Sequence, residues 1–165
     1  IATVLLSAIM TDTVITKSPT CTDYDLVQAE KLGAIIGKKP TEFGLEVFKM
    51  RGGDNDLSVE ELCTHDSKEF KKGDDVYMVA QHETVTLDVA MEREAEYREF
   101  LRQKVAENGY KFALLLVTDI FNEGSKFICE GDVAPVSEAF GIDATKAEWV
   151  DGILSRKKQV IPPLS

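Results

Sequence analysis

The chain has 165 residues, of which 44% are hydrophobic and 29% charged, a balance typical of a soluble globular protein with a sizeable core. Its formal net charge of -10 repels nucleic acid and anionic membranes, which argues against a nucleic-acid-binding domain and requires any polyanionic ligand to meet a local basic site. Three widely spaced cysteines and the lack of a transmembrane-length apolar run predict a cytoplasmic protein without disulfides, zinc site or membrane span.

The first third of the chain predicts helices. Residues 1–10 are apolar on nearly every side and suit a buried helix that needs a partner to cover it, so we expect a fragment of a larger chain. Thr22 is expected to cap a second helix that ends at Gly37, and Pro40 to open a third that ends at two glycines. Residues 52–56, with the sequence G-G-D-N-D, are the best candidate for a linker.

Beyond the linker the pattern becomes that of an α/β protein. Ser58 and Glu61 fit a capping box for a short helix, and the chain then leads through residues 68–70 to a turn at 73–75. Alternating side chains predict a strand over 76–85. Thr86 is expected to cap the longest helix, which runs through the Ala90–Val105 region and ends at residues 108 and 109.

The continuous apolar run of residues 112–120 predicts a central strand buried on both faces. A turn at 122–125, a strand at 126–129, a short helix over 132–140 and a final strand beginning near Trp149 are expected to follow. The succession of strand, helix and buried strand indicates an α/β layer architecture with Arg156 and Lys157 at a sheet edge or end.

Three features could carry chemistry. The cations at residues 156–158 are a candidate anion clamp, with a solvated basic tail as the alternative. Asp12, directly after an apolar run, is either a metal ligand or a helix-end cap. Thr118 and Asp119 are either catalytic or cap the next turn, whereas His65 and His82 lack metal-like partners at helical spacing.

Six blocks extend in order from residue 7 to residue 164. They are S-A-I-M-T-D-T (7–13), K-S-P-T-C-T (17–22), D-S-K-E-F (66–70), N-G-Y (108–110), V-T-D-I (117–120) and S-R-K-K-Q-V-I-P-P-L (155–164). Together they resemble the C-terminal half of family II, manganese-dependent inorganic pyrophosphatases of the DHH phosphoesterase superfamily. The second and the last block are the most specific.

The resemblance implies two domains and a division of the site between them. Residues 1–53 resemble the end of the DHH domain, and residues 54–165 resemble the DHH-associated C-terminal domain, a mixed β-sheet flanked by helices. Asp12 matches an aspartate metal ligand of the family. Lys68, Arg156 and Lys157 match the cations that hold the phosphates of pyrophosphate. The implied cofactor is Mn²⁺, with Mg²⁺ or Co²⁺ as alternatives, in the full-length enzyme.

The sequence also departs from the family. The Asp-His-His motif and the other metal ligands have no counterpart here, so we expect the isolated chain to bind metals weakly and to be inactive. Residues 81–85 are Q-H-E-T-V where the family commonly has Q-V-N-T-V, which makes His82 a local substitution and not a ligand.

Two other functions stay open at this stage. One is an exopolyphosphatase of the same superfamily, and the other is a non-catalytic phosphate-binding or interaction module. For the first-ranked function the implied partners are pyrophosphate and the missing N-terminal DHH domain, through which the full-length protein is expected to form a homodimer.

Overall fold

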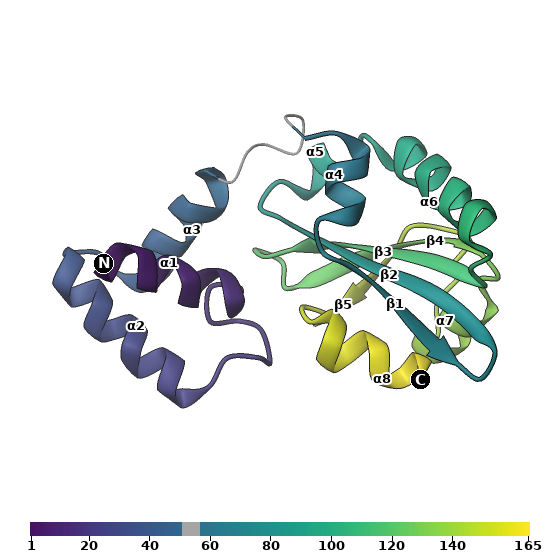
Figure 1. The fold of residues 1–165 in the computed structure, drawn as a ribbon. Helices are drawn as coiled ribbons and strands as arrows, with labels where there is room; N and C mark the ends of the chain where they lie inside the picture. Colours follow the sequence, from purple (N-terminus) through teal and green to yellow (C-terminus); the bar gives the residue numbers. More distant parts are fainter. Residues whose placement is uncertain (51–56) are drawn as a thin grey trace. The chain divides into compact units, whose positions relative to one another are not determined.

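The structure, a computed structural model, describes residues 1–50 and 57–165 (Figure 1). The chain divides into two units, Ile1–Gly53 and Asp54–Ser165. The linker predicted at residues 52–56 and the glycines expected to end the third helix lie outside the described residues. Among the described residues, no helix combines the length and the apolar character that crossing a membrane requires.

In residues 1–50, the first unit contains three helices: α1 (Ala2–Asp12), α2 (Asp23–Ile36) and α3 (Pro40–Met50). The predicted cap of α2 is confirmed, because the Thr22 hydroxyl accepts a hydrogen bond from the backbone N–H of Asp25, whose carboxylate accepts one in return. Gly37 ends this helix in the left-handed conformation, as predicted. Only Leu6 and Met10 of α1 are buried, and Val4 and Leu5 are exposed, so the described residues do not supply the partner that the sequence predicted for this helix.

The second unit is a five-stranded mixed sheet with helices on both faces, which confirms the predicted fold class (Figure 1). The strand order is β1-β2-β3-β4-β5, and only the β2–β3 pair is parallel. The strands are β1 (Ser67–Lys72), β2 (Asp75–Thr84), β3 (Phe112–Asp119), β4 (Gly124–Gly131) and β5 (Glu148–Asp151). Every residue of β3 is buried, as predicted for the central strand.

Helices of the second unit cover the two faces of the sheet separately. They are α4 (Val59–Thr64), α5 (Leu87–Met91), α6 (Glu94–Asn108), α7 (Ala134–Phe140), the π-helical turn η1 (Arg156–Val160) and α8 (Ile161–Leu164). One apolar cluster joins α4, α5 and α6 to the sheet through residues such as Leu62 and Leu101. The other joins α7, η1 and α8 to the opposite face through residues such as Val136, Val160 and Leu164.

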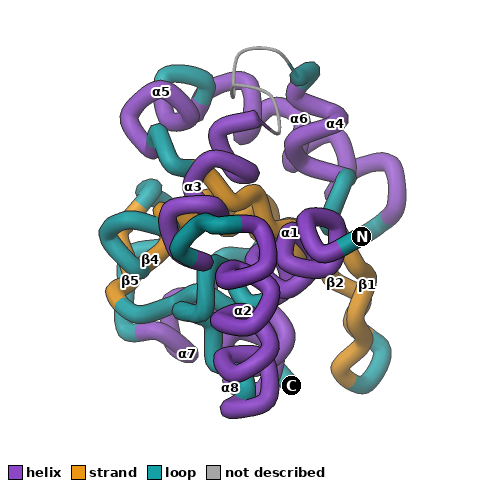
Figure 2. The backbone as a smooth tube through the Cα atoms, turned by 90° about the vertical axis from the view of Figure 1, so that its left-hand side faces the viewer, coloured by secondary structure: helices purple, strands orange, loops and turns teal. Residues whose placement is uncertain are grey.

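Three elements differ from the sequence predictions. The stretch before the turn at residues 73–75 is a strand, β1, which forms a hairpin with β2 (Figure 2). The predicted longest helix is broken into α5 and α6, and Thr86 makes no side-chain cap for it. At the break, the guanidinium of Arg93 donates a hydrogen bond to the carbonyl of Leu57 at 2.7 Å. The sequence around the break contains no glycine or proline from which the end of a helix could be predicted.

Candidate functional site

The three consecutive cations lie in a helical turn and not at the end of the final strand, which corrects the sequence prediction. Gly152, in the left-handed conformation with φ 71°, ends the extended chain after β5. The Ser155 hydroxyl then accepts a hydrogen bond from the backbone N–H of Lys158 at 3.3 Å and caps η1. Pro162 occupies an early position of the following α8, where a missing N–H costs no intrahelical bond.

Arg156 is the buried member of this turn, with a side chain that is 8% exposed. Its Nη1 donates to the backbone carbonyls of Asp66 and Val79, and its Nη2 donates to the Asp66 carboxylate at 2.6 Å. These bonds use three of the five N–H groups of the guanidinium. The other two have no partner among residues 1–50 and 57–165, so the side chain is anchored on one side and can bind an anion on the other.

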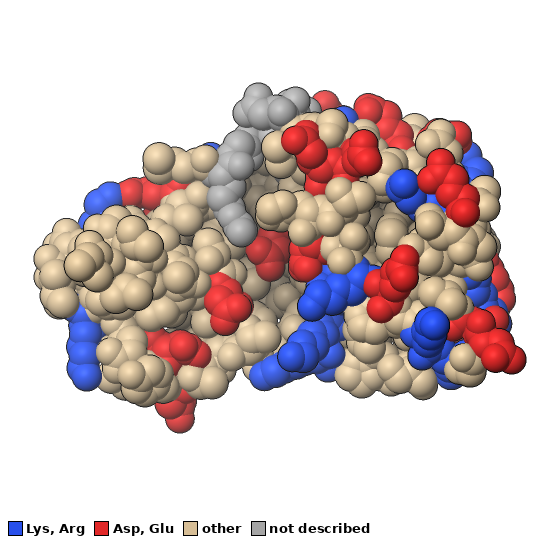
Figure 3. Space-filling view, in the orientation of Figure 1, with Lys and Arg blue, Asp and Glu red and all other residues tan. Residues whose placement is uncertain are grey.

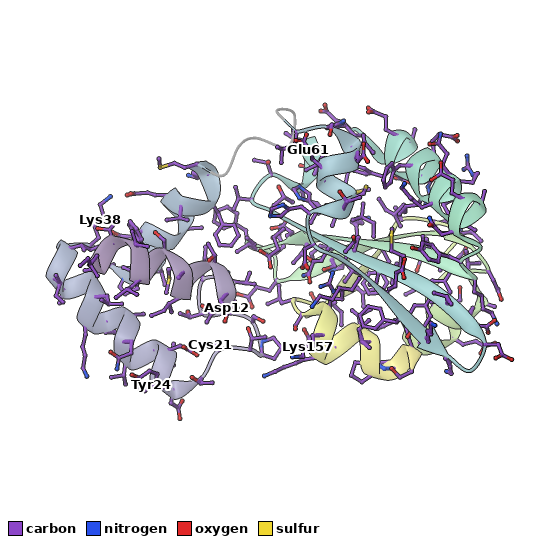
Figure 4. The ribbon with its side chains drawn as sticks, in the orientation of Figure 1. Asp12, Cys21, Tyr24, Lys38, Glu61 and Lys157 are labelled. Atoms are coloured by element: carbon purple, nitrogen blue, oxygen red, sulfur yellow. The ribbon has the colours of Figure 1, made fainter. Side chains whose placement is uncertain are left out.

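Lys68 and Lys157 are exposed. The strand position of Lys68 and the turn η1 belong to the same face of the sheet, because Phe70, Val79 and Val160 pack in one cluster. Lys68 stands opposite Val79 in the β1–β2 ladder, and the Val79 carbonyl is itself a partner of the Arg156 guanidinium. Lys157 follows Arg156 in η1 and lies at the solvent side of the turn (Figure 4). Neither ammonium group has a hydrogen-bonded or ion-paired partner in the described part of the chain.

These residues produce a local basic site on an acidic protein. The space-filling view shows Lys and Arg side chains gathered where η1 and the start of β1 lie (Figure 3). Within the second unit, the three predicted phosphate-binding residues, Lys68, Arg156 and Lys157, lie on neighbouring segments, because the Arg156 guanidinium bonds to Asp66, two residues before Lys68, and to Val79, opposite Lys68. Such a group can neutralise several charges of a small polyanion, and the Arg fork matches phosphate oxygens.

Asp12 belongs to the first unit, where it is the exposed last residue of α1 (Figure 4). Its backbone carbonyl accepts a hydrogen bond from the Thr20 hydroxyl at 3.0 Å. The turn that follows holds three consecutive non-glycine residues at positive φ, Val14, Ile15 and Thr16. This conformation is costly for β-branched side chains, and the burial of Val14 and Ile15 offsets the cost.

The described residues do not by themselves fit a manganese ion. They contain no group of three or more His, Cys, Asp or Glu side chains placed to hold a metal. Asp12 alone provides one carboxylate, whereas such ions need several oxygen or nitrogen ligands. Burial raises the pKa of the Cys63 and Cys129 thiols to about 12, which keeps them protonated and unsuited to metal binding or nucleophilic attack.

Asp119 caps the turn after β3. Its carboxylate accepts hydrogen bonds from the backbone N–H groups of Phe121 at 2.8 Å and Asn122 at 3.1 Å. Of the two interpretations left open by the sequence, the structure therefore supports the structural one for this residue.

Two residues near the cations have no role in the sequence reasoning, although both lie in stretches it singled out. Asp66 is the ionic partner of Arg156. Its position two residues before Lys68 was the only feature of the sequence that could have linked it to the cations. Gln81 contacts the backbone of the cation-bearing segment from 75 residues away in sequence, a relation that no local pattern reveals.

The chain is similar in sequence to known proteins. The chain is 37% identical over 167 residues to the manganese-dependent inorganic pyrophosphatase of Bacillus subtilis, with 100% of this chain and 54% of the relative covered. It is 35% identical over 166 residues to the manganese-dependent inorganic pyrophosphatase of Methanocaldococcus jannaschii, again over 54% of that protein. The chain thus spans about half the length of these curated relatives.

Solved structures and family models extend the comparison. A crystal structure of a Methanococcus jannaschii protein assigned as a family II inorganic pyrophosphatase matches 97% of this chain and 52% of its own, with a TM-score of 0.86 and 35% identity. The model of the DHHA2 domain matches residues 45–165. Because this match covers most of the sequence, the chain belongs to the DHHA2 domain family.

Proposed function

We propose that this chain is the substrate-binding half of a manganese-dependent inorganic pyrophosphatase, which hydrolyses pyrophosphate to two phosphates. The observation that carries the proposal is the group of Lys68, Arg156 and Lys157 on one face of the second unit, with two cations that have no partner among the described residues. The names of the relatives supply the substrate, and the cations supply the means to bind it.

In this proposal the cations hold pyrophosphate and neutralise charge on its oxygens. Lys68 and Lys157 approach the anion as mobile point charges, whereas Arg156 presents the free side of an anchored guanidinium. Charge that develops on the departing phosphate is stabilised by the same groups without further rearrangement. Manganese bound to the full-length protein would supply an activated water, and Asp12 would be one of its ligands together with residues of an N-terminal DHH domain.

Further parts of the proposal concern the full-length protein. It combines this chain with the DHH domain seen in the family, forms a homodimer through that domain and works in the cytoplasm. All three cysteines are free, which supports a reducing compartment.

The test compares variants of the full-length protein in a phosphate-release assay with Mn²⁺. Lys157→Gln should raise the KM for pyrophosphate about tenfold, because one charge-assisted hydrogen bond is lost. Lys158→Gln is the matched control in the same turn and should change KM less than about twofold. Arg156→Ala should lose most of the activity while circular dichroism shows an intact fold.

Unchanged kinetics in both Lys157→Gln and Arg156→Ala would contradict the proposal. A wild-type protein that releases phosphate from polyphosphate but not from pyrophosphate would identify an exopolyphosphatase instead. Release from neither substrate would favour a non-catalytic phosphate-binding module.

A further inference from the structure

A line of buried polar side chains crosses the sheet beside the cation-bearing segment. Gln81 of β2, Thr118 of β3 and Ser125 of β4 lie on neighbouring strands and are all at most 7% exposed. The Gln81 Nε2 donates to the Thr118 hydroxyl at 2.9 Å, and the hydroxyls of Thr118 and Ser125 are 2.8 Å apart. A buried amide in a sheet core is costly unless all its groups are bonded, so this line calls for an explanation.

The line ends on the backbone that leads into η1. The Ser125 hydroxyl donates to the Ile153 carbonyl at 2.8 Å, and the Gln81 Nε2 donates to the Leu154 carbonyl at 3.2 Å. The Gln81 Oε1 accepts a hydrogen bond from the backbone N–H of Arg156 at 3.1 Å. One side-chain amide therefore holds the peptide groups on both sides of Ser155.

These contacts replace regular secondary structure. Residues 152–155 lie between β5 and η1, so their peptide groups need partners elsewhere. Gln159 supplies some from within the turn, because its Oε1 accepts from the N–H groups of Leu154 and Ser155, both at 2.9 Å. Gln81 is the residue whose side chain bonds the backbone N–H of Arg156 to the sheet.

We propose that Gln81 is a positioning residue for the phosphate-binding cations. By fixing the Arg156 backbone against β2, it sets where the free side of the guanidinium and the adjoining Lys157 meet the anion. The inference rests on the proposed function, since its ligand is pyrophosphate. Gln81 itself does not touch the ligand in this proposal.

The experiment uses Gln81→Met in the full-length protein, because Met has a similar volume but no amide. The KM for pyrophosphate should rise about tenfold at a temperature where the variant is fully folded, with a smaller change in kcat. Thr118→Val leaves both contacts from Gln81 to the segment in place and should raise KM less than about threefold. Amide hydrogen exchange at Arg156, followed by NMR in the 165-residue chain, should accelerate in Gln81→Met.

A destabilising control variant distinguishes an effect of Gln81 on the position of the cations from an effect on the stability of the fold. Ile128 is fully buried in the cluster on the opposite face of the sheet, so Ile128→Val should lower the melting temperature and leave KM unchanged. Gln81→Met with the KM of the wild type, or Thr118→Val with an effect as large as Gln81→Met, would overturn the inference. A wild-type protein without pyrophosphatase activity would instead overturn the proposed function, and the inference with it.

Discussion

In the proposed function, the side chain of Arg156 serves both the fold and a ligand. A fully solvated arginine would lose much conformational freedom on binding an anion. Here the bonds to Asp66 and Val79 have already fixed the side chain, so this entropy is lost on folding and not on binding. The two lysines beside it are exposed and lack this anchoring.

The Asp66 carboxylate makes a testable contribution at the residue scale. Asp66→Asn keeps an oxygen that can accept from Arg156 but removes the charge, so the free energy of unfolding should fall by about 1 kcal/mol. Asp66→Ala also removes the acceptor and should cost about twice as much. Urea denaturation followed by circular dichroism measures both changes.

Asp74→Asn, in the exposed turn between β1 and β2, is the matched control and should leave the stability unchanged. Equal stability of all three variants and the wild type would show that the Asp66–Arg156 pair does not anchor the turn.

At the scale of elements, the start of β4 is constrained by the tryptophan of β5. A Cβ atom added to Gly124 would lie 2.2 Å from the Cζ2 of Trp149, far closer than atoms approach without displacement. Gly124→Ala should therefore lower the free energy of unfolding by about 1–3 kcal/mol through overpacking. Thermal and urea unfolding of the single variant test this.

The double variant Gly124→Ala with Trp149→Leu tests the cause. If the clash is responsible, the two changes should couple, and the double variant should be more stable than the sum of the single effects predicts. Additive effects would mean that Gly124 is needed for another reason.

Elements with local signals were predicted from the sequence. The capping boxes at Thr22 and Ser58, the left-handed glycines Gly37 and Gly109, and the apolar run of β3 each act within a few residues of the chain. These helix ends and the central strand lie where the sequence predicted them, although the helix that ends at Gly109 begins at Glu94 and not after Thr86.

Elements decided by distant contacts were not predicted. The strand β1 is S-K-E-F-K-K, a charged sequence that suits a sheet edge but has no strand-like alternation of apolar side chains. The helical path of the chain after Gly152 depends on Gln81, Ser125 and Asp66, all of them distant in sequence. The identities of the candidate cations were available from the resemblance, whereas their anchoring was visible only in the structure.

At the scale of the whole molecule, the distribution of ligands predicts an inactive chain. The described residues hold the cations of the proposed site but no cluster of metal ligands. The isolated 165-residue chain should therefore release no phosphate from pyrophosphate above the blank when Mn²⁺ is added. The full-length protein under the same conditions is the control, and manganese-dependent release by the chain alone would contradict the prediction.

The polar line across the sheet also has a consequence for folding. Arg156 meets partners 75 to 90 positions earlier in sequence, so the contacts that complete its surroundings have among the longest chain separations in the second unit. Contacts of this kind form late in folding, because the entropy lost on closing the long loop between the two residues must first be offset by other contacts. We therefore expect a folding intermediate or transition state to contain the β2–β3–β4 core while the cationic turn is still unformed. A folding intermediate of this kind would contain most of the sheet but would not bind anions at the proposed site.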